Sequence, residues 1–159
     1  MFFLAQALAI ISFLLGATAY QRKNRKNILS LWAWSAFFNT LHFLALGSLE
    51  SALFAAATAI RFLVASRTSS KIALLIIILL ILSLFIFVPR DDVGIMAFLA
   101  ATVGAIGAFQ SNPNAVRLLL FASTSLWAVN NYLVGSPIGF FMEVVFLVSN
   151  FWGYHNSKK

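Results

Sequence analysis

The chain has 159 residues, of which 62% are hydrophobic and only 9% are charged, and its formal net charge is +7. Soluble domains contain about 45–50% apolar and about 25% charged residues, so this composition excludes a water-soluble fold and indicates lipid as the main solvent. Most Lys and Arg residues lie at the ends of apolar runs and not in one patch, which predicts a role in membrane topology and no nucleic-acid partner. With no cysteine, disulfides and thiolate metal sites are excluded.

Seven apolar segments follow one another, and the sequence predicts an all-α integral membrane protein because helices satisfy their own backbone groups in lipid. The first segment lacks a basic start and a small-residue cleavage pattern, so we expect a retained helix rather than a signal peptide. The fourth, IALLIIILLILSLFIFV, is typical of a lipid-facing spacer. The expected spans are residues 2–20, 28–46, 50–66, 72–88, 94–109, 118–134 and 139–154.

The three segments before the fourth are echoed by the three after it. With Gln21 placed on Gln110 and a one-residue gap near the end, the aligned positions are Ser35 with Thr124, His42 with Asn131, and the Gly-Ser pair at 47–48 with that at 135–136. Because one helix separates two units of three, both units enter the membrane in the same sense as parallel repeats. The predicted domains are a first three-helix repeat at 1–66, a linker with the fourth transmembrane helix at 67–93, and a second repeat with a basic tail at 94–159.

The distribution of basic residues predicts the orientation in the membrane. One set of alternating loops carries a single basic residue, Arg90, and the other set carries Arg22, Lys23, Arg25, Lys26, Arg67, Lys71, Arg117, Lys158 and Lys159. Basic loops face the cytoplasm. We therefore expect a multi-pass protein with its N-terminus outside and its C-terminus in the cytoplasm.

Several segments resemble known membrane families. QRKNRKNILSLWAW, NTLHFLALGS and NNYLVGSPIGFF are similar to the bacterial inner-membrane family called YgjV, over nearly the whole chain. The 3+1+3 arrangement resembles the SWEET and PQ-loop transporters and the PnuC vitamin transporters, and Gln21-Arg22-Lys23-Asn24 is similar to a PQ-loop segment with Tyr20 in place of its proline. The first resemblance implies the bacterial cytoplasmic (inner) membrane and no particular activity. The second implies a transporter.

Two stripes of side chains at membrane depth are the candidate substrate-binding residues. Spacings of i, i+4 and i+7 in the first stripe, and of i, i+3 and i+7 in the second, put the residues of each stripe on one helix face. The stripes are Ser35, Asn39 and His42 in the second span, and Thr124, Trp127 and Asn131 in the sixth. Hydroxyl, amide and imidazole groups without fixed charge, beside the flat face of Trp127, predict a small neutral polar solute such as a sugar, a nucleoside or a vitamin-like compound. Hydrogen bonds between helices are the alternative role for these groups.

Two charged residues interrupt the spans. Arg61 is near the cytoplasmic end of the third span, and we expect its side chain to extend to the membrane interface. Glu143 is a candidate for carrying the coupling proton of a symporter. No Lys or Arg belongs to the two stripes, so strong anions are expected to fit the site less well than neutral solutes.

The sequence offers no enzyme motif and predicts neither a cofactor nor a metal, since His42 and His155 are far apart in the chain. The preferred function is a membrane transporter or facilitator, whose partners are the lipid bilayer and the solute. A non-transporting, membrane-embedded binding or regulatory subunit remains the alternative. A homo-oligomer also remains open.

Overall fold

The computed structural model describes residues 1–20, 22 and 24–156, without the side chains of residues 20, 113, 114 and 152–156. Gln21, Lys23, Lys158, Lys159 and the side chain of His155 therefore lie outside the described residues. The described part of the chain is all-helical, and its seven helices confirm the number and order of the expected spans. They are α1 (Phe2–Tyr20), α2 (Arg25–Leu46), α3 (Leu49–Ala65), α4 (Lys71–Phe87), α5 (Asp92–Ala108), α6 (Pro113–Leu133) and α7 (Pro137–Asn156).

Polar caps decide where the helices begin. Asn24 accepts hydrogen bonds from two backbone N–H groups in the first turn of α2, and Asn112 accepts one from Ala115 in the first turn of α6. Proline fits the first helical position because its missing N–H would have no partner there, and α6 begins at Pro113. Hence α6 starts ahead of residue 118, the position expected from the apolar run alone.

Tight turns follow α2 and α6. Each helix ends before a glycine in the left-handed region, Gly47 with φ 82° and Gly135 with φ 71°. Glycine enters this region without the steric penalty that a Cβ would bring. In each turn the next residue is a serine, Ser48 or Ser136, which directly precedes the following helix.

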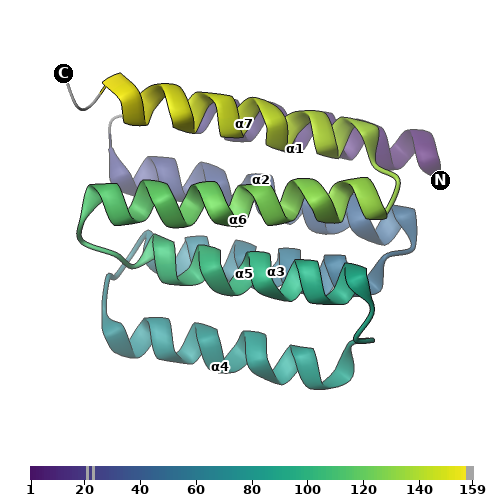
Figure 1. The fold of residues 1–159 in the computed structure, drawn as a ribbon, viewed down its shortest axis with the longest axis horizontal. Coiled ribbons are helices and arrows are strands. Elements are labelled where there is room, and N and C mark those ends of the chain that lie inside the picture. The colour runs from purple at the N-terminus through teal and green to yellow at the C-terminus, as the bar shows by residue number, and fades with distance from the viewer. Residues whose placement is uncertain (21, 23, 157–159) are drawn as a thin grey trace.

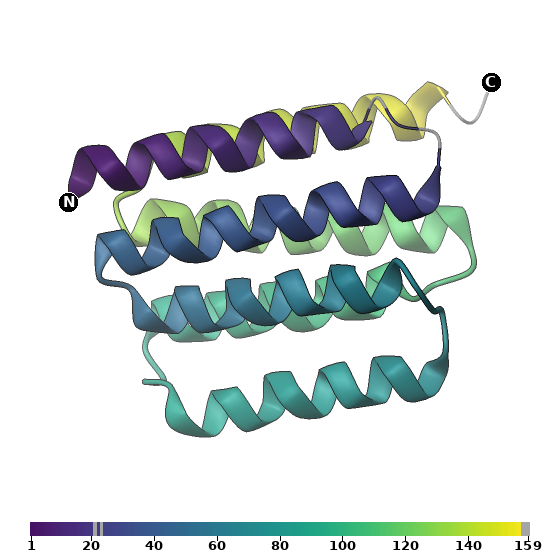
Figure 2. The same ribbon diagram turned by 180° about the vertical axis from the view of Figure 1, so that it is seen from behind.

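The helices form two layers with one helix at the edge (Figure 1). In one layer α2 packs between α1 and α3, and in the other α6 packs between α5 and α7. Figure 2 shows the first layer from its outer side, with α7, α6 and α5 behind it. Contacts of α1 with α7 and of α3 with α5 join the layers, and α4 packs against α3 and α5. The central pair, α2 and α6, therefore faces across the middle of the bundle.

Each helix reverses direction relative to the one before it, so the loops gather at two ends (Figure 1). The loops after α1, α3 and α5 lie at the same end as the C-terminus, and the N-terminus lies at the other end. Exposed basic residues at the first end include Arg22, Arg25, Arg67 and Lys71. Arg90 is at the opposite end, in the loop between α4 and α5.

The outer surface is apolar and the interior is rich in small residues. Large hydrophobic side chains such as Ile72 (71% exposed) and Phe87 (84% exposed) cover the outside. Inside, the buried residues of α5 are alanines and glycines, which allow close helix packing in lipid. By length and hydropathy α1 and α2 can each cross a membrane, and α4, α5 and α7 contain shorter apolar stretches. This pattern agrees with lipid as the solvent around the bundle.

Candidate functional site

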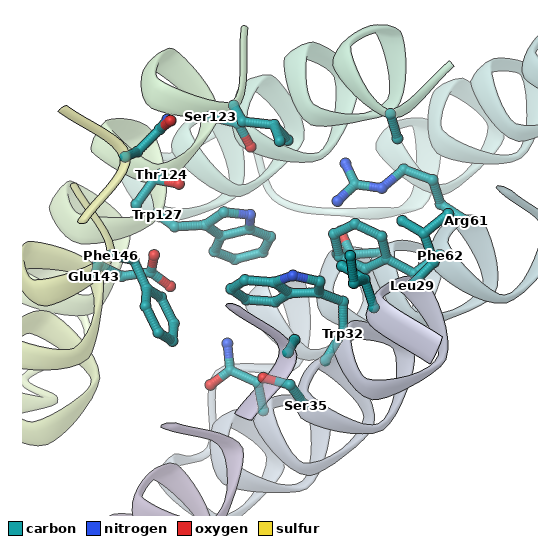
Figure 3. Close-up of a pocket in the computed structure, with 18 of the residues that line it drawn as sticks. Leu29, Trp32, Ser35, Arg61, Phe62, Ser123, Thr124, Trp127, Glu143 and Phe146 are labelled. Carbon is teal, nitrogen blue, oxygen red and sulfur yellow. The ribbon is translucent and has the colours of Figure 1, made fainter. Parts of the chain in front are cut away.

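A cavity of about 500 Å³ lies between the two layers, where α2 faces α6 (Figure 3). At one end it is lined by Arg22, Arg25 and Gln110, which are exposed at the basic end of the bundle. At the other end it stops at the buried side chains of Asn39 and Trp127. The cavity is thus open towards the basic loops and closed towards the opposite end.

Four of the six predicted binding residues line this cavity. Ser35 and Asn39 face it from α2, and Thr124 and Trp127 face it from α6. Glu143, the candidate proton carrier, also lines it, and Figure 3 shows its carboxyl group near Trp127. The two helix faces chosen from the sequence are therefore brought together on opposite walls.

His42 and Asn131, the other two predicted binding residues, are not among the residues that line the cavity. Both side chains are 0% exposed. His42 Nδ1 lies 2.7 Å from the carbonyl oxygen of Ala5 and donates to it, and Asn131 Nδ2 donates to the carbonyl oxygen of Trp127 at 3.0 Å. The two side chains approach each other without a hydrogen bond of normal geometry. They lie beyond the closed end because backbone carbonyls of α1 and α6 hold them there.

Arg61 does line the cavity, and the expectation that it extends to the interface is wrong. Its side chain is only 2% exposed, and Nη1 donates to the carbonyl oxygen of Ala101 in α5 at 3.4 Å. The guanidinium carbon lies 4.2 Å from the ring centroid of Phe62, and Nε has no hydrogen-bond partner among the described residues. Arg61 lies on the α3 face that carries Ala57, Thr58 and Ala65, all of which are buried.

The charges around the cavity are mostly positive. Arg22, Arg25, Arg61 and Arg117 line it, and Glu143 is the only acidic residue in the described lining. Arg25 is held at the mouth by a 2.7 Å hydrogen bond from Nη1 to the carbonyl oxygen of Ala65. Charges in a partly enclosed, low-dielectric space act more strongly than at an open surface. The cavity therefore presents a positive field to a solute that enters it.

Aromatic rings form the middle of the cavity. Trp32 stacks on Phe62 with centroids 5.9 Å apart and meets Phe146 edge-on at 5.1 Å. Figure 3 shows Trp32 and Trp127 facing the open space between Arg61 and Glu143. At the closed end, Phe43 stacks on Trp127 with centroids 5.8 Å apart. Sequence reasoning found Trp127 but missed Trp32, which lies in the second expected span and also lines the cavity.

Equivalent hydrogen bonds occur in the two layers. His42 in α2 contacts the carbonyl oxygen of Ala5 in α1, and Asn130 Nδ2 in α6 donates to that of Val93 in α5 at 3.0 Å. Each residue of the second pair lies 88 positions after its counterpart in the first. His42 in one layer and Asn130 in the other thus make the same kind of contact between neighbouring helices.

Serine side chains repeat this spacing. Ser35 Oγ donates to the carbonyl oxygen of Ser12, and Ser123 Oγ donates to that of Ala100, both at 2.8 Å and again 88 positions apart. The contacts pair Ser35 with Ser123 rather than with Thr124, and they pair His42 with Asn130. This pairing differs by one residue from the sequence alignment within these helices, and it needs no gap before the Gly-Ser pair.

The lining of the cavity follows the same spacing. Eleven pairs of lining residues are 88 positions apart, among them Ser35 with Ser123, Asn39 with Trp127, Ala55 with Glu143 and Arg61 with Ser149. In the other seven pairs the first members are Arg22, Ile28, Leu29, Trp32, Ala36, Thr58 and Phe62, and each second member lies 88 positions later. Matching positions on the two walls thus carry different side chains. The two charged residues inside the bundle, Arg61 and Glu143, each match an uncharged residue.

An all-helical bundle with an apolar exterior and an internal cavity that polar and charged side chains help to line is typical of a helical integral membrane protein. Residues 3–159 match the family described as Imp-YgjV, bacterial inner membrane protein, and the chain belongs to this family. It is similar to the inner membrane protein YgjV of Escherichia coli strain K12, with 29% identity over 150 residues that cover 94% of this chain and 81% of the relative. No solved structure matches the chain. The resemblance to the YgjV family is confirmed, and so is a location in the bacterial inner membrane.

Proposed function

We propose that this protein is a transporter or facilitator that carries a small polar solute through the central cavity. The observation that supports this most is the cavity itself, which lies at membrane depth, is open at one end and closed at the other, and has matching positions on its two walls. Polar side chains inside a membrane are costly and mark solute or ion pathways. A non-transporting binding or regulatory subunit would need an external docking face and not a polar cavity.

The proposal includes two parallel three-helix units, α1–α3 and α5–α7, linked by α4. The constant spacing of 88 residues between matching hydrogen bonds supports this arrangement. Parallel repeats place a solute site at their interface, and rocking of one repeat against the other exposes it to each side in turn. The described conformation would then be the one open to the basic end.

We further propose that the basic end faces the cytoplasm, with the N-terminus outside. Arg22, Arg25, Arg67 and Lys71 are at this end and Arg90 is at the other. Positively charged loops are retained on the cytoplasmic side of a membrane. In this orientation the cavity receives solute from, or releases it to, the cytoplasm.

The solute class is widened relative to the expectation from the sequence. Sugars, nucleosides and vitamin-like compounds suit the hydroxyl and amide groups of Ser35, Asn39 and Thr124 and the flat face of Trp127. Anions were expected to fit less well because no basic residue belongs to the two stripes. Arg61 reaches the cavity from α3, so that reason for excluding them no longer holds.

Single-cysteine labelling tests the proposal without knowledge of the solute, since the chain has no cysteine of its own. Thr124→Cys places a thiol on the cavity wall. If the cavity opens to each side in turn, a membrane-impermeant maleimide should label it both in intact cells and in inside-out vesicles. A binding or regulatory subunit would permit labelling from one side only, and that result would refute the transport proposal.

Three control positions interpret the labelling. Ser69→Cys, at the basic end, should react only in inside-out vesicles, and Asp92→Cys, at the opposite end, only in intact cells. Val129→Cys lies on the same helix as Thr124 with 45% of its side chain exposed on the apolar exterior, so lipid should protect it from both sides. The opposite pattern at Ser69 and Asp92 would overturn the proposed orientation.

Glu143 is proposed to carry a coupling proton. Its side chain is 6% exposed, lines the cavity, and makes no ion pair or hydrogen bond with another residue in the described part of the chain. In proteoliposomes, solute uptake by the wild type should rise severalfold under an inward proton gradient, and uptake by Glu143→Gln should not respond to it. Glu50→Gln is the matched control, because Glu50 lies at the start of α3 outside the cavity. A full response in Glu143→Gln would assign the coupling to another group.

A further inference from the structure

Arg61 is a buried cation without a counter-ion in the described structure. It forms no ion pair, and its one hydrogen bond, to the carbonyl oxygen of Ala101, is long at 3.4 Å. A buried charge that is neither paired nor fully hydrogen-bonded is strongly unfavourable. The ring of Phe62 compensates part of this through the 4.2 Å contact, but a ring face cannot accept the N–H groups in the guanidinium plane. The positive charge of Arg61 is therefore not balanced by an anion within the described structure.

The packing holds the guanidinium in place instead of leaving it free to move. A Cβ at Gly104 would collide with Arg61 Nη1, so the absence of a side chain there makes room for the guanidinium beside α5. The same Cβ would lie 2.6 Å from Ser123 Oγ, which is itself fixed by its bond to Ala100. A charge positioned by a glycine and two neighbouring helices is a built feature of the cavity wall.

Two further polar atoms of the cavity lining have no partner. Asn39 Oδ1 and Thr58 Oγ1 are buried and make no hydrogen bond to any described residue, as is true of Arg61 Nε. Buried polar groups in folded proteins nearly always have partners. Both residues line the cavity from the same layer as Arg61, so this wall carries several polar groups whose hydrogen bonds are not made within the described structure.

The remaining walls specify the shape and the other end of such a molecule. The indole rings of Trp32 and Trp127 lie between Arg61 and Glu143 (Figure 3), and their faces can contact a flat ring. Trp32 is kept in place by its contacts with Phe62 and Phe146. Across the cavity Glu143 can accept a hydrogen bond, and it would repel a second anionic group. A volume of about 500 Å³ is within the range of small-molecule sites.

We propose that the cavity binds a small aromatic carboxylate that carries a hydroxyl or amino group at its far end. The carboxylate accepts from the Arg61 guanidinium, the ring lies against the indoles of Trp32 and Trp127, and the far substituent donates to Glu143. Arg is well suited to this task because its planar fork matches a carboxylate. The carboxylate of Glu143 on the opposite wall favours a monoanion over a phosphate, whose second charge it would repel. The inference rests on the proposed function in using the same cavity, but it concerns binding alone.

The test compares two probes that differ in charge and hardly in shape, 4-hydroxybenzoate and 4-hydroxybenzamide. Binding to the purified full-length protein in mild detergent at neutral pH is followed by quenching of tryptophan fluorescence and by thermal shift. The wild type should bind the benzoate about tenfold more tightly than the amide, as expected from one charge-assisted hydrogen-bonded pair. Equal binding of the two probes, or no binding of the benzoate at millimolar concentration, would overturn the proposal.

Variants then assign the preference to Arg61. Arg61→Gln should bind both probes equally, and Arg61→Lys should retain only part of the preference because it lacks the planar fork. Gly104→Ala keeps the arginine but displaces its guanidinium, so it should also weaken benzoate binding. Arg67→Gln, an exposed residue just beyond α3 that does not line the cavity, removes the same charge and should bind like the wild type. Retention of the full preference by Arg61→Gln contradicts the assignment.

These measurements also separate the inference from the proposed function. Selective benzoate binding without uptake into proteoliposomes would leave the inference standing and contradict transport. Uptake of neutral solutes that Arg61→Gln leaves unchanged, with no preference for the benzoate, would support transport and refute the inference. If Arg61→Gln fails to fold, the wild-type comparison of the two probes and the Gly104→Ala and Arg61→Lys variants decide the question.

Discussion

Phe43→Ala is expected to lower the free energy of unfolding by about 3 kcal/mol. Phe43 is 0% exposed, belongs to the main hydrophobic cluster and stacks on Trp127 at the closed end of the cavity. Truncating a buried Phe in a soluble protein costs about 3–5 kcal/mol, part of which comes from the cavity left behind. The lower end of this range applies because lipid, unlike water, solvates the ring of Phe43 well when unfolding exposes it. Thermal or denaturant unfolding in mild detergent measures the effect.

Phe37→Ala is the matched control for this prediction. Phe37 lies on the same helix, but 43% of its side chain is exposed on the outer surface. Its loss leaves no internal void, so the change should remain below about 1 kcal/mol. Similar effects for both variants would show that Phe43 is not packed as described. Because Phe43 also supports Trp127, the variant should weaken probe binding in the cavity, whereas Phe37→Ala should not.

Gly139→Ala is the second variant with a large expected effect, about 1–3 kcal/mol of destabilisation from overpacking. A Cβ at this position would collide with Asn131 Oδ1 and would lie 2.5 Å from Ser136 Oγ. Asn131 is 0% exposed and held by its bond to Trp127, and Ser136 is 1% exposed and accepts the N–H of Gly139. Neither side chain has space into which it can retreat.

A double-mutant cycle with Asn131→Ala identifies the cause. Removing the Asn131 amide creates room for the new methyl group, so Gly139→Ala should cost less in the Asn131→Ala background than in the wild type. Melting temperatures of the four proteins in the same detergent give the coupling. If the two changes are simply additive, the collision with Asn131 is not the source of the destabilisation.

The sequence predicted much of this fold because its main features follow from local patterns. The lengths of the apolar runs located every helix. The two ends of the bundle were distinguished because Arg90 is in one set of loops and the other basic loop residues are in the other set. The start of α6 was missed because its first turn is polar and is specified by Asn112 and Pro113 and not by hydrophobicity. Where hydropathy and helix capping disagree, the cap decides the boundary.

The cavity was only partly predictable for a different reason. Helical periodicity put Ser35 and Asn39 on one face, and these residues do line the cavity. The same periodicity cannot give depth, and His42 lies one turn further along, beyond the closed end. Arg61 was missed because its partner surface, Gly104 on α5, is distant in sequence. A glycine that creates space for a charge from another helix leaves no signal in either segment alone.

The unequal charges on the two walls affect how many ways a solute can bind. Walls that match in backbone position would accept a molecule in two poses related by a half-turn. Ser149 matches Arg61 and Ala55 matches Glu143, so only one pose places a carboxylate on a cation. Giving up the second pose costs RT ln 2, about 0.4 kcal/mol, against about 1.5–3 kcal/mol for a hydrogen bond to a charged group. A molecule with unlike ends would therefore bind in a single pose, and in the transport that we propose every copy would pass through the bundle with the same end leading.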